Sequence, residues 1–160
     1  AQSIVYTKSA ASSAKEALIN GAPVLCDSRM VCEGVIRTKL PADNEVLCWN
    51  NCAESLALAK KLGTTRSAAA VELWRPKLAG AVVVVGNAPT TLFRLLEVLE
   101  EGVDPPAVIF GLPVGFVGAA ESKELLVKQC KESVQFLTLN GRRGGSAMAA
   151  AAVNALTSDG

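Results

Sequence analysis

The sequence has 160 residues, half of them hydrophobic, which is enough for one domain with a substantial core. Sixteen basic and fifteen acidic residues leave a formal net charge of +1, so the chain has no general electrostatic attraction to nucleic acid or to an anionic membrane surface. No apolar run approaches the roughly 20 residues of a membrane-spanning helix. We therefore expect no nucleic-acid partner and no membrane span.

The N-terminal stretch AQSIVYTKSAASSAKEAL lacks the charged and then apolar order of a signal peptide, and it does not begin with Met. We expect either a fragment or a mature form that has lost a presequence. A reducing compartment is expected from the cysteines below. This would be the cytoplasm, or an organelle stroma or matrix if Ala1 is a processed N-terminus.

The cysteines are odd in number and irregular in spacing, which is typical of reduced thiols that pack as small hydrophobic residues. They are Cys26, Cys32, Cys48, Cys52 and Cys130. The spacing of Cys48 and Cys52 resembles the start of a zinc site, but no second pair of Cys or His with ligand spacing follows. We expect no metal site.

Short β-rich runs alternate with helical patterns along the whole chain. In chain order these patterns predict helix 9–20, strand 23–27, strand 44–49, helices 53–63 and 64–78, strand 81–85, helix 90–102, strand 107–111, helix 119–130, strand 134–139 and helix 145–156. Pro76 is expected to end or kink its helix. The alternation predicts a single domain over residues 1–160, with a three-layer α/β/α fold and a mainly parallel sheet.

The strand AVVVV at 81–85 is apolar on both faces, as a central parallel strand should be. The strands near 82–85, 107–110 and 135–139 are expected to be buried and adjacent.

Unusual glycine-containing loops follow three of the predicted strands. They are GNAPTT (86–91), GLPVGFVGAAESK (111–123) and NGRRGGSA (140–147). In a parallel sheet all three lie at the carboxyl edge, where ligands bind, and each leads into a helix N-terminus with free amides. Arg142 and Arg143 add bidentate donors, so the loops predict a site for a carboxylate or a phosphate. The alternative is a set of tight turns with solvated arginines.

Nucleotide-binding motifs do not fit these loops. The segment GLPVGFVG has the wrong glycine spacing for a dinucleotide fingerprint, and the sequence contains no Walker-type phosphate loop.

Six segments resemble the precorrin-8X methylmutase family, also called precorrin isomerases. They are NGAPVLCDSRMV, LPADNEV, LGTTRSAAAVELW, GAVVVVGNAPTTLFRLLE, FGLPVGFVGAAESKE and NGRRGGSAMAAAAVNAL. They occur in the family's order and spacing, over about Asn20 to Leu156.

The resemblance implies a three-layer α/β fold and a homodimer, or a subunit of a larger assembly. It implies a corrin-type tetrapyrrole ligand with many peripheral carboxylates, and no cofactor. The reaction is a 1,5-sigmatropic methyl shift from C-11 to C-12, which converts precorrin-8X to hydrogenobyrinate, or the cobalt-containing counterpart. The substrate-binding residues that the motifs carry over are Thr65, Arg66, Ser67, Asn87, Gly115, Gly118, Arg142, Arg143, Gly144, Gly145 and Ser146. The pair Glu121 and Lys123 is interpreted as an ordinary ion pair at a helix start.

The family's proposed general acid is a histidine upstream of the matching region, and these 160 residues contain no histidine. Two interpretations stay open. The chain is part of an isomerase that needs the upstream segment, or it is a catalytically inactive member that binds a tetrapyrrole or serves as a structural subunit. Cys32, Glu33 and Tyr6 are the candidates for a substitute acid. We expect the chain to bind a corrinoid such as hydrogenobyrinate more readily than it isomerises precorrin-8X.

Overall fold

The computed structural model describes residues 3–50 and 52–157, and within these residues six strands form one sheet in the order β1-β6-β5-β4-β2-β3. The strands are β1 (Ile4–Tyr6), β2 (Val24–Cys26), β3 (Val46–Leu47), β4 (Val82–Val85), β5 (Val108–Gly111) and β6 (Gln135–Leu139). Neighbouring strands from β2 to β6 are parallel, and β1 alone pairs antiparallel, with Val5 opposite Thr138. The predicted α/β fold with a mainly parallel sheet is confirmed.

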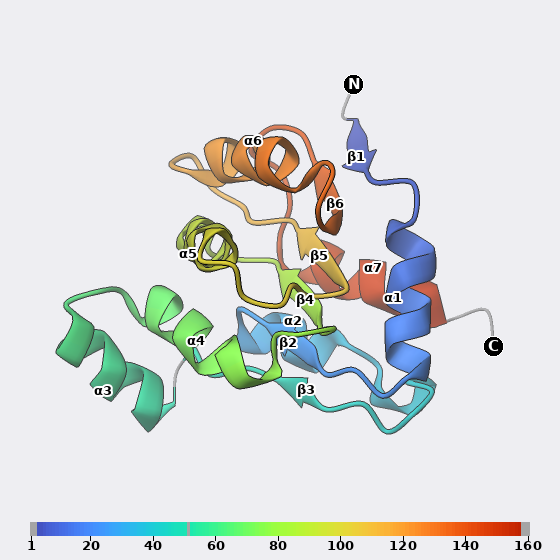
Figure 1. Ribbon diagram of the computed structural model, residues 1–160, viewed down its shortest axis with the longest axis horizontal. Coiled ribbons are helices and arrows are strands. Elements are labelled where there is room, and N and C mark those ends of the chain that lie inside the picture. The colour runs from blue at the N-terminus through green and yellow to red at the C-terminus, as the bar shows by residue number, and fades with distance from the viewer. Residues whose placement is uncertain (1–2, 51, 158–160) are drawn as a thin grey trace.

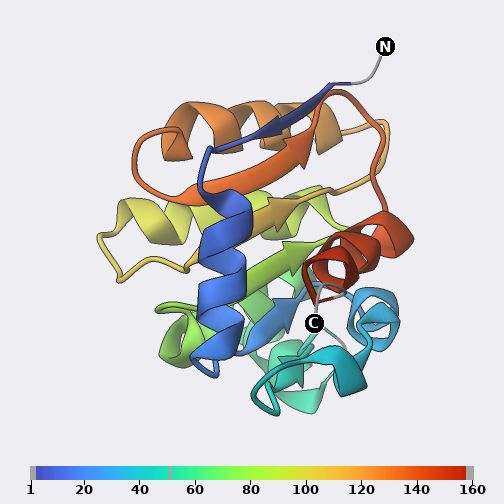
Figure 2. The same cartoon turned by 90° about the vertical axis from the view of Figure 1, so that its right-hand side faces the viewer.

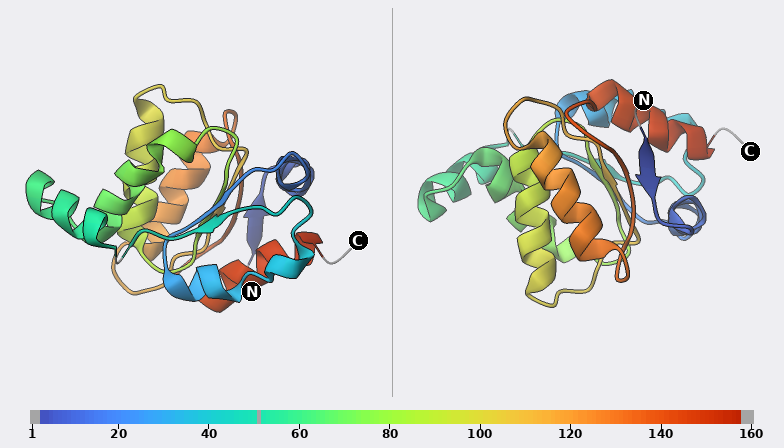
Figure 3. Two further views of the ribbon diagram at one scale, coloured as in Figure 1. Left: turned by 90° about the horizontal axis from the view of Figure 1, so that it is seen from below. Right: turned by 90° about the horizontal axis from the view of Figure 1, so that it is seen from above.

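Helices cover both faces of this sheet (Figures 1 to 3). The α-helices are α1 (Ala10–Ile19), α2 (Arg29–Gly34), α3 (Ala53–Leu62), α4 (Arg66–Trp74), α5 (Pro89–Glu100), α6 (Ala119–Cys130) and α7 (Ser146–Thr157), and two short 3-10 helices are η1 (Arg37–Lys39) and η2 (Arg75–Lys77). Figure 3 shows α1, α2 and α7 on one face of the sheet and α4, α5 and α6 on the other, while α3 lies outside the layers and packs on α4.

The four valines of β4 explain why the sheet is buried from both sides. Val82 and Val84 belong to the core under α1 and α7, whereas Val83 and Val85 belong to the core under α4, α5 and α6. None of these valines is exposed to solvent, and burying a valine side chain contributes roughly 1.5–3 kcal/mol. The three central strands β4, β5 and β6 are adjacent and largely buried, as the apolar runs predict.

Several boundaries differ from those expected from the sequence. The region expected as strand 44–49 forms a strand only over Val46–Leu47. The region expected as one helix over 64–78 is α4 followed by η2, because Pro76 has no N–H to continue the α-helical hydrogen bonds. Strand β1 and helix α2 were not predicted, since three and six residues are too short to show a periodic pattern.

Candidate functional site

The three glycine-containing loops meet at the carboxyl edge of the sheet. The amide of Gly145 donates to the carbonyl of Leu112 at 2.9 Å, and the amide of Gly115 donates to the carbonyl of Arg142 at 3.4 Å. The amide of Val114 donates to the carbonyl of Asn87, also at 3.4 Å. The loops after β4, β5 and β6 therefore form one continuous surface, as a parallel sheet requires.

Two glycines are needed where the loops pass closest to each other. A Cβ atom on Gly86 would lie 2.7–2.9 Å from Val31 Cγ2, Ala149 Cβ and Ser146 Cα. A Cβ atom on Gly144 would lie 2.7 Å from the carbonyl oxygen of Pro113 and still closer to that of Leu112. No side chain fits at either position, so the start of α7 can pack directly against the ends of β4 and β5.

Gly118 and Ser146 lie where α6 and α7 begin, at the same edge of the sheet. Gly118 precedes α6 with a φ of 87°, and a Cβ atom there would lie 3.3 Å from Pro89 Cβ at the start of α5. The Ser146 hydroxyl lies 3.1 Å from the hydroxyl of Ser28, which also caps α2 by accepting a hydrogen bond from the amide of Val31.

Asp27 is a residue of this edge that the sequence analysis missed. It follows β2 directly and is only 2% exposed. Its Oδ1 accepts a hydrogen bond from the amide of Gly86, and its Oδ2 accepts from the amides of Asn87 and Ala88, each at 2.8 Å. Burial raises the pKa of the Asp27 carboxyl above its usual value, while the amide hydrogen bonds act in the opposite direction.

These contacts correct one expectation about the loop at 86–91. Its amides were expected to be free for a ligand carboxylate, but those of Gly86, Asn87 and Ala88 already donate to Asp27. Only the arrangement in space reveals this, because Asp27 and Gly86 are 59 positions apart in the sequence.

Lys123, on α6, holds the loop after β6 through hydrogen bonds to its backbone. Its side chain is buried, and its ammonium donates to the carbonyls of Gly141, at 3.0 Å, and Arg143. Burial lowers the pKa of Lys123 from its usual value. The interpretation of Lys123 as half of a helix-start ion pair with Glu121 is wrong, because its ammonium points into the loop at 140–147.

Arg142 carries the positive charge at the rim. Its guanidinium carbon lies 5.5 Å from the centre of the Phe116 ring, a cation–π contact between the loops after β6 and β5. Phe116 is 84% exposed and its neighbour Val117 is 90% exposed. The rim therefore combines an exposed apolar loop with a guanidinium placed over it, next to the exposed side chain of Arg143.

The carried-over residues at 65–67 lie at a neighbouring groove. Thr65 caps α4, since its hydroxyl accepts a hydrogen bond from the amide of Ala68 at 3.1 Å. Thr65 also lines a groove of about 440 Å³ between α4 and α5, opposite Thr90 and Phe93. Arg66 is exposed and Ser67 half-buried. The groove shares Thr90 with the loop at 86–91 and lies on the α4 side of α5, whereas α6 packs on the other side of α5 (Figure 1).

The three candidates for a substitute acid have different surroundings. The guanidinium of Arg37 donates to Cys32 Sγ at 3.2 Å, and hydrogen bonds from Cys26 and then Arg37 lower the pKa of Cys32 to about 6. Glu33 is exposed and pairs with Arg29 at 3.4 Å. Tyr6 lies on the edge strand β1, opposite Leu137.

Among the residues that the structure describes, the cysteines and acidic side chains do not assemble into a metal site. All five cysteines are unpaired thiols. Within residues 3–50 and 52–157, no group of three or more His, Cys, Asp or Glu side chains has an arrangement that could hold a metal ion. Over the same residues, no helix is both long and apolar enough to span a membrane.

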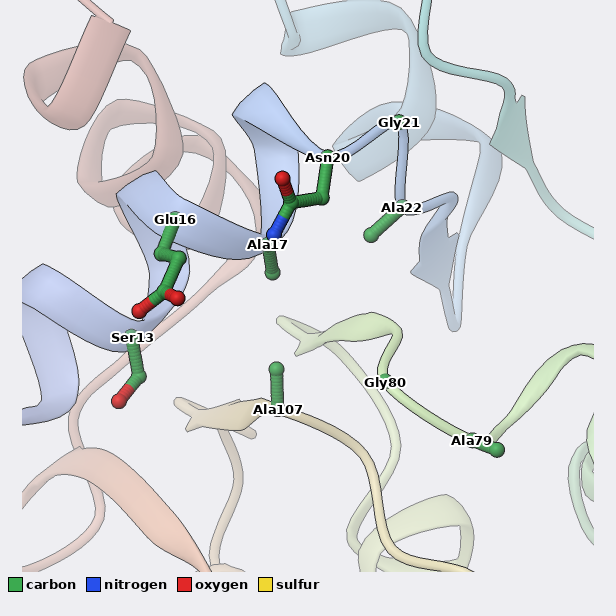
Figure 4. Close-up of a pocket in the computed structure, with 9 residues that line it drawn as sticks. All are labelled: Ser13, Glu16, Ala17, Asn20, Gly21, Ala22, Ala79, Gly80 and Ala107. Atoms are coloured by element: carbon green, nitrogen blue, oxygen red, sulfur yellow. The ribbon is translucent and has the colours of Figure 1, made fainter.

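A different hollow, of about 490 Å³, lies at the opposite, amino edge of the sheet (Figure 4). It is lined mainly by small residues of α1 and of the segments before β4 and β5, together with Ser13, Glu16 and Asn20. None of its lining residues is cationic and Glu16 is acidic, so it is less suited to a carboxylate ligand than the loop surface with Arg142.

Comparisons with known proteins identify the family. The family model described as precorrin-8X methylmutase matches residues 1–158. The precorrin-8X methylmutase of Pseudomonas aeruginosa is 56% identical over 154 residues, which cover 96% of this chain and 74% of the relative. The cobalt-precorrin-8 methylmutase of Priestia megaterium is 34% identical, over 98% of this chain and 68% of the relative.

A solved structure agrees with this result. The crystal structure of precorrin-8X methylmutase from Thermus thermophilus superposes with a TM-score of 0.85 at 35% identity, over 96% of this chain and 74% of that one. The chain spans about three quarters of the length of the Pseudomonas aeruginosa and Thermus thermophilus proteins. Fold, loops and sequence together show that the chain belongs to the precorrin-8X methylmutase family.

Proposed function

We propose that the chain binds a corrin-type tetrapyrrole on the loop surface at the carboxyl edge of its sheet. The observation that carries the proposal is the position of Arg142 over Phe116, beside the exposed Val117. A corrin precursor has an extensive apolar ring system with carboxylates at its periphery. The exposed apolar loop is suited to the ring, and the arginine is suited to a peripheral carboxylate.

We propose precorrin-8X as the substrate and the methyl shift to hydrogenobyrinate as the reaction. Identity to a relative named for precorrin-8X is 56%, against 34% for one named for cobalt-precorrin-8, which favours the cobalt-free macrocycle. The shift is an isomerisation, so no electrons enter or leave. The protein's part is to bind the ring, hold its carboxylates in one orientation and place an acid near the carbon atoms between which the methyl group moves.

Binding without turnover is the second candidate function for these 160 residues. It is favoured by the absence of histidine from them. Cys32 is a poor substitute donor at neutral pH, because a thiol with a pKa of about 6 is mostly ionised there. A positioned acid typically contributes roughly 10²–10⁴-fold to a rate, so turnover without one is expected to be slower by that factor.

Visible absorption of the macrocycle tests both parts of the proposal. Titration with hydrogenobyrinate measures binding, and the spectral change on adding precorrin-8X measures isomerisation. Arg142→Ala should weaken binding by roughly tenfold to a hundredfold, since a charge-assisted hydrogen bond contributes about 1.5–3 kcal/mol. Lys60→Ala, which removes an exposed cation of α3, outside the layers of the fold, is the control.

The outcomes separate the candidates. Binding that Arg142→Ala weakens, without turnover, supports the binder. Binding with rapid turnover supports an isomerase whose acid lies within these residues. Failure of the wild-type chain to bind hydrogenobyrinate contradicts both.

We also propose that the chain forms a homodimer or joins a larger assembly, as the resemblance to the family implies. Light scattering that shows a monomer at all concentrations would contradict this.

A further inference from the structure

Asp27 occupies a position in which a ligand carboxylate would otherwise be expected. Backbone amides at the start of a helix attract anions, because their N–H groups are unpaired and the helix dipole is positive there. In the turn just before α5, which begins at Pro89, the amides of Gly86, Asn87 and Ala88 all converge on the Asp27 carboxylate. The chain therefore supplies its own anion to the turn that leads into this helix.

Asp27 and its neighbour Ser28 together connect the loop after β4 with the loop after β6. Asp27 holds the turn after β4, and its neighbour Ser28 lies 3.1 Å from Ser146 at the start of α7. Gly86, whose amide bonds to Asp27, is also the glycine against which Ser146 packs. The 86–88 backbone is therefore in contact with the start of α7, into which the loop that carries Arg142 leads.

Neighbouring charge makes this arrangement selective. A carboxylate at Asp27 repels a second carboxylate at the 86–88 amides, and the hydrogen-bond donors there are already used. The guanidinium of Arg142 lies instead over Phe116, in the loop after β5. A ligand that carries several carboxylates is thus oriented with one of them at the arginines.

We propose that Asp27 is a positioning residue of the ligand site, which fixes the turn at 86–88 and directs the carboxylates of the tetrapyrrole to the loop at 140–147. The proposal rests on the proposed function, because it assumes a ligand with carboxylates. Asp27 acts through the backbone and is not required to contact the ligand.

Formate provides the test, because it replaces the carboxylate that Asp27→Ala removes. In this variant the affinity for hydrogenobyrinate should fall by between about tenfold and a hundredfold, which is typical when a residue that orients the ligand-binding groups is removed. Sodium formate should restore much of the loss, and sodium chloride at equal ionic strength should not. Asp27→Asn should also lose affinity but should not respond to formate, because its side chain still fills the position. Asp104→Ala, an exposed acid after α5, is the control for net charge.

A second readout does not depend on the tetrapyrrole. The amide NMR resonances of Gly86, Asn87 and Ala88 should move in Asp27→Ala and return towards their wild-type positions with formate. A purely structural role predicts a lower unfolding temperature without recovery of affinity by formate, so all titrations are made where circular dichroism shows a folded variant. If Asp27→Ala does not fold, Asp27→Asn carries the test through its loss of affinity.

The outcomes are distinct from those for the proposed function. If wild type binds hydrogenobyrinate and the Asp27 variants bind equally well, the inference is overturned. It is also overturned if formate changes neither the affinity nor the three amide resonances of Asp27→Ala. If wild type does not bind the tetrapyrrole, the proposed function fails, and the amide resonances still report whether a carboxylate belongs at this turn.

Discussion

Replacing Lys123 by Met should destabilise the protein and loosen the loop at 140–147. The buried ammonium donates to the carbonyls of Gly141 and Arg143, and hydrogen bonds to a charged group contribute about 1.5–3 kcal/mol each. Two terms reduce the net loss. Burial of the charge already opposes its protonation, as the lowered pKa of Lys123 indicates, and water reaches the carbonyls of this exposed loop. We expect a loss of about 1–3 kcal/mol in the free energy of unfolding.

Urea denaturation measures this loss. With a slope of about 1–3 kcal/mol per molar urea, the midpoint should fall by roughly 1 M. Lys128→Met, which changes an exposed lysine of the same helix, is the matched control and should leave the midpoint almost unchanged. A Lys123→Met midpoint equal to that of the control would refute the assigned role.

The pH dependence provides an independent check. Because folding lowers the pKa of Lys123, the unfolded chain binds the proton more tightly in the window between the lowered pKa and the usual value near 10.4. The stability of wild type relative to Lys123→Met should therefore rise as the pH increases through that window. A difference that is flat or falls with pH would contradict the burial of a charged lysine.

Two further changes test the packing and the thiols. Gly86→Ala should lower the free energy of unfolding by about 1–3 kcal/mol, because the added Cβ atom would overlap Ala149 and the backbone of Ser146. A thermal unfolding temperature equal to that of wild type would contradict this close contact. The alkylation of Cys32 by iodoacetamide should have a pH midpoint of about 6, and Arg37→Ala should raise that midpoint. The buried Cys130, whose pKa burial raises to about 11, should not react at neutral pH. Mass spectrometry of the alkylated peptides measures both cysteines, and a Cys32 midpoint unaffected by Arg37→Ala would contradict the role of the guanidinium.

The long elements of the fold could be predicted because their patterns are strong. The run AVVVV predicts a central strand, and the amphipathic pattern after it predicts α5, since both depend only on local spacing. The position of the loops at one edge followed from the parallel order of the strands. Strand β1 could not be predicted in this way, because three residues become a strand only by pairing with β6.

The contacts inside the site were beyond the sequence patterns. Asp27 follows a short strand like any turn residue, and only the fold brings it to the amides at 86–88. Lys123 looks like an exposed helix residue because Glu121 lies close to it in sequence, yet the loop from β6 buries its ammonium. In both cases a charged group forms hydrogen bonds with backbone atoms of a distant segment, and the pattern of side chains along the sequence cannot predict such partners.

Amide chemical-shift mapping with hydrogenobyrinate shows directly where the ligand binds on the fold. We expect shifts concentrated in the loops at 86–91, 111–123 and 140–147, with little change around the hollow at the amino edge, such as at Ala107 (Figure 4). Shifts centred on that hollow, with the resonances of Arg142 and Phe116 unchanged, would contradict it.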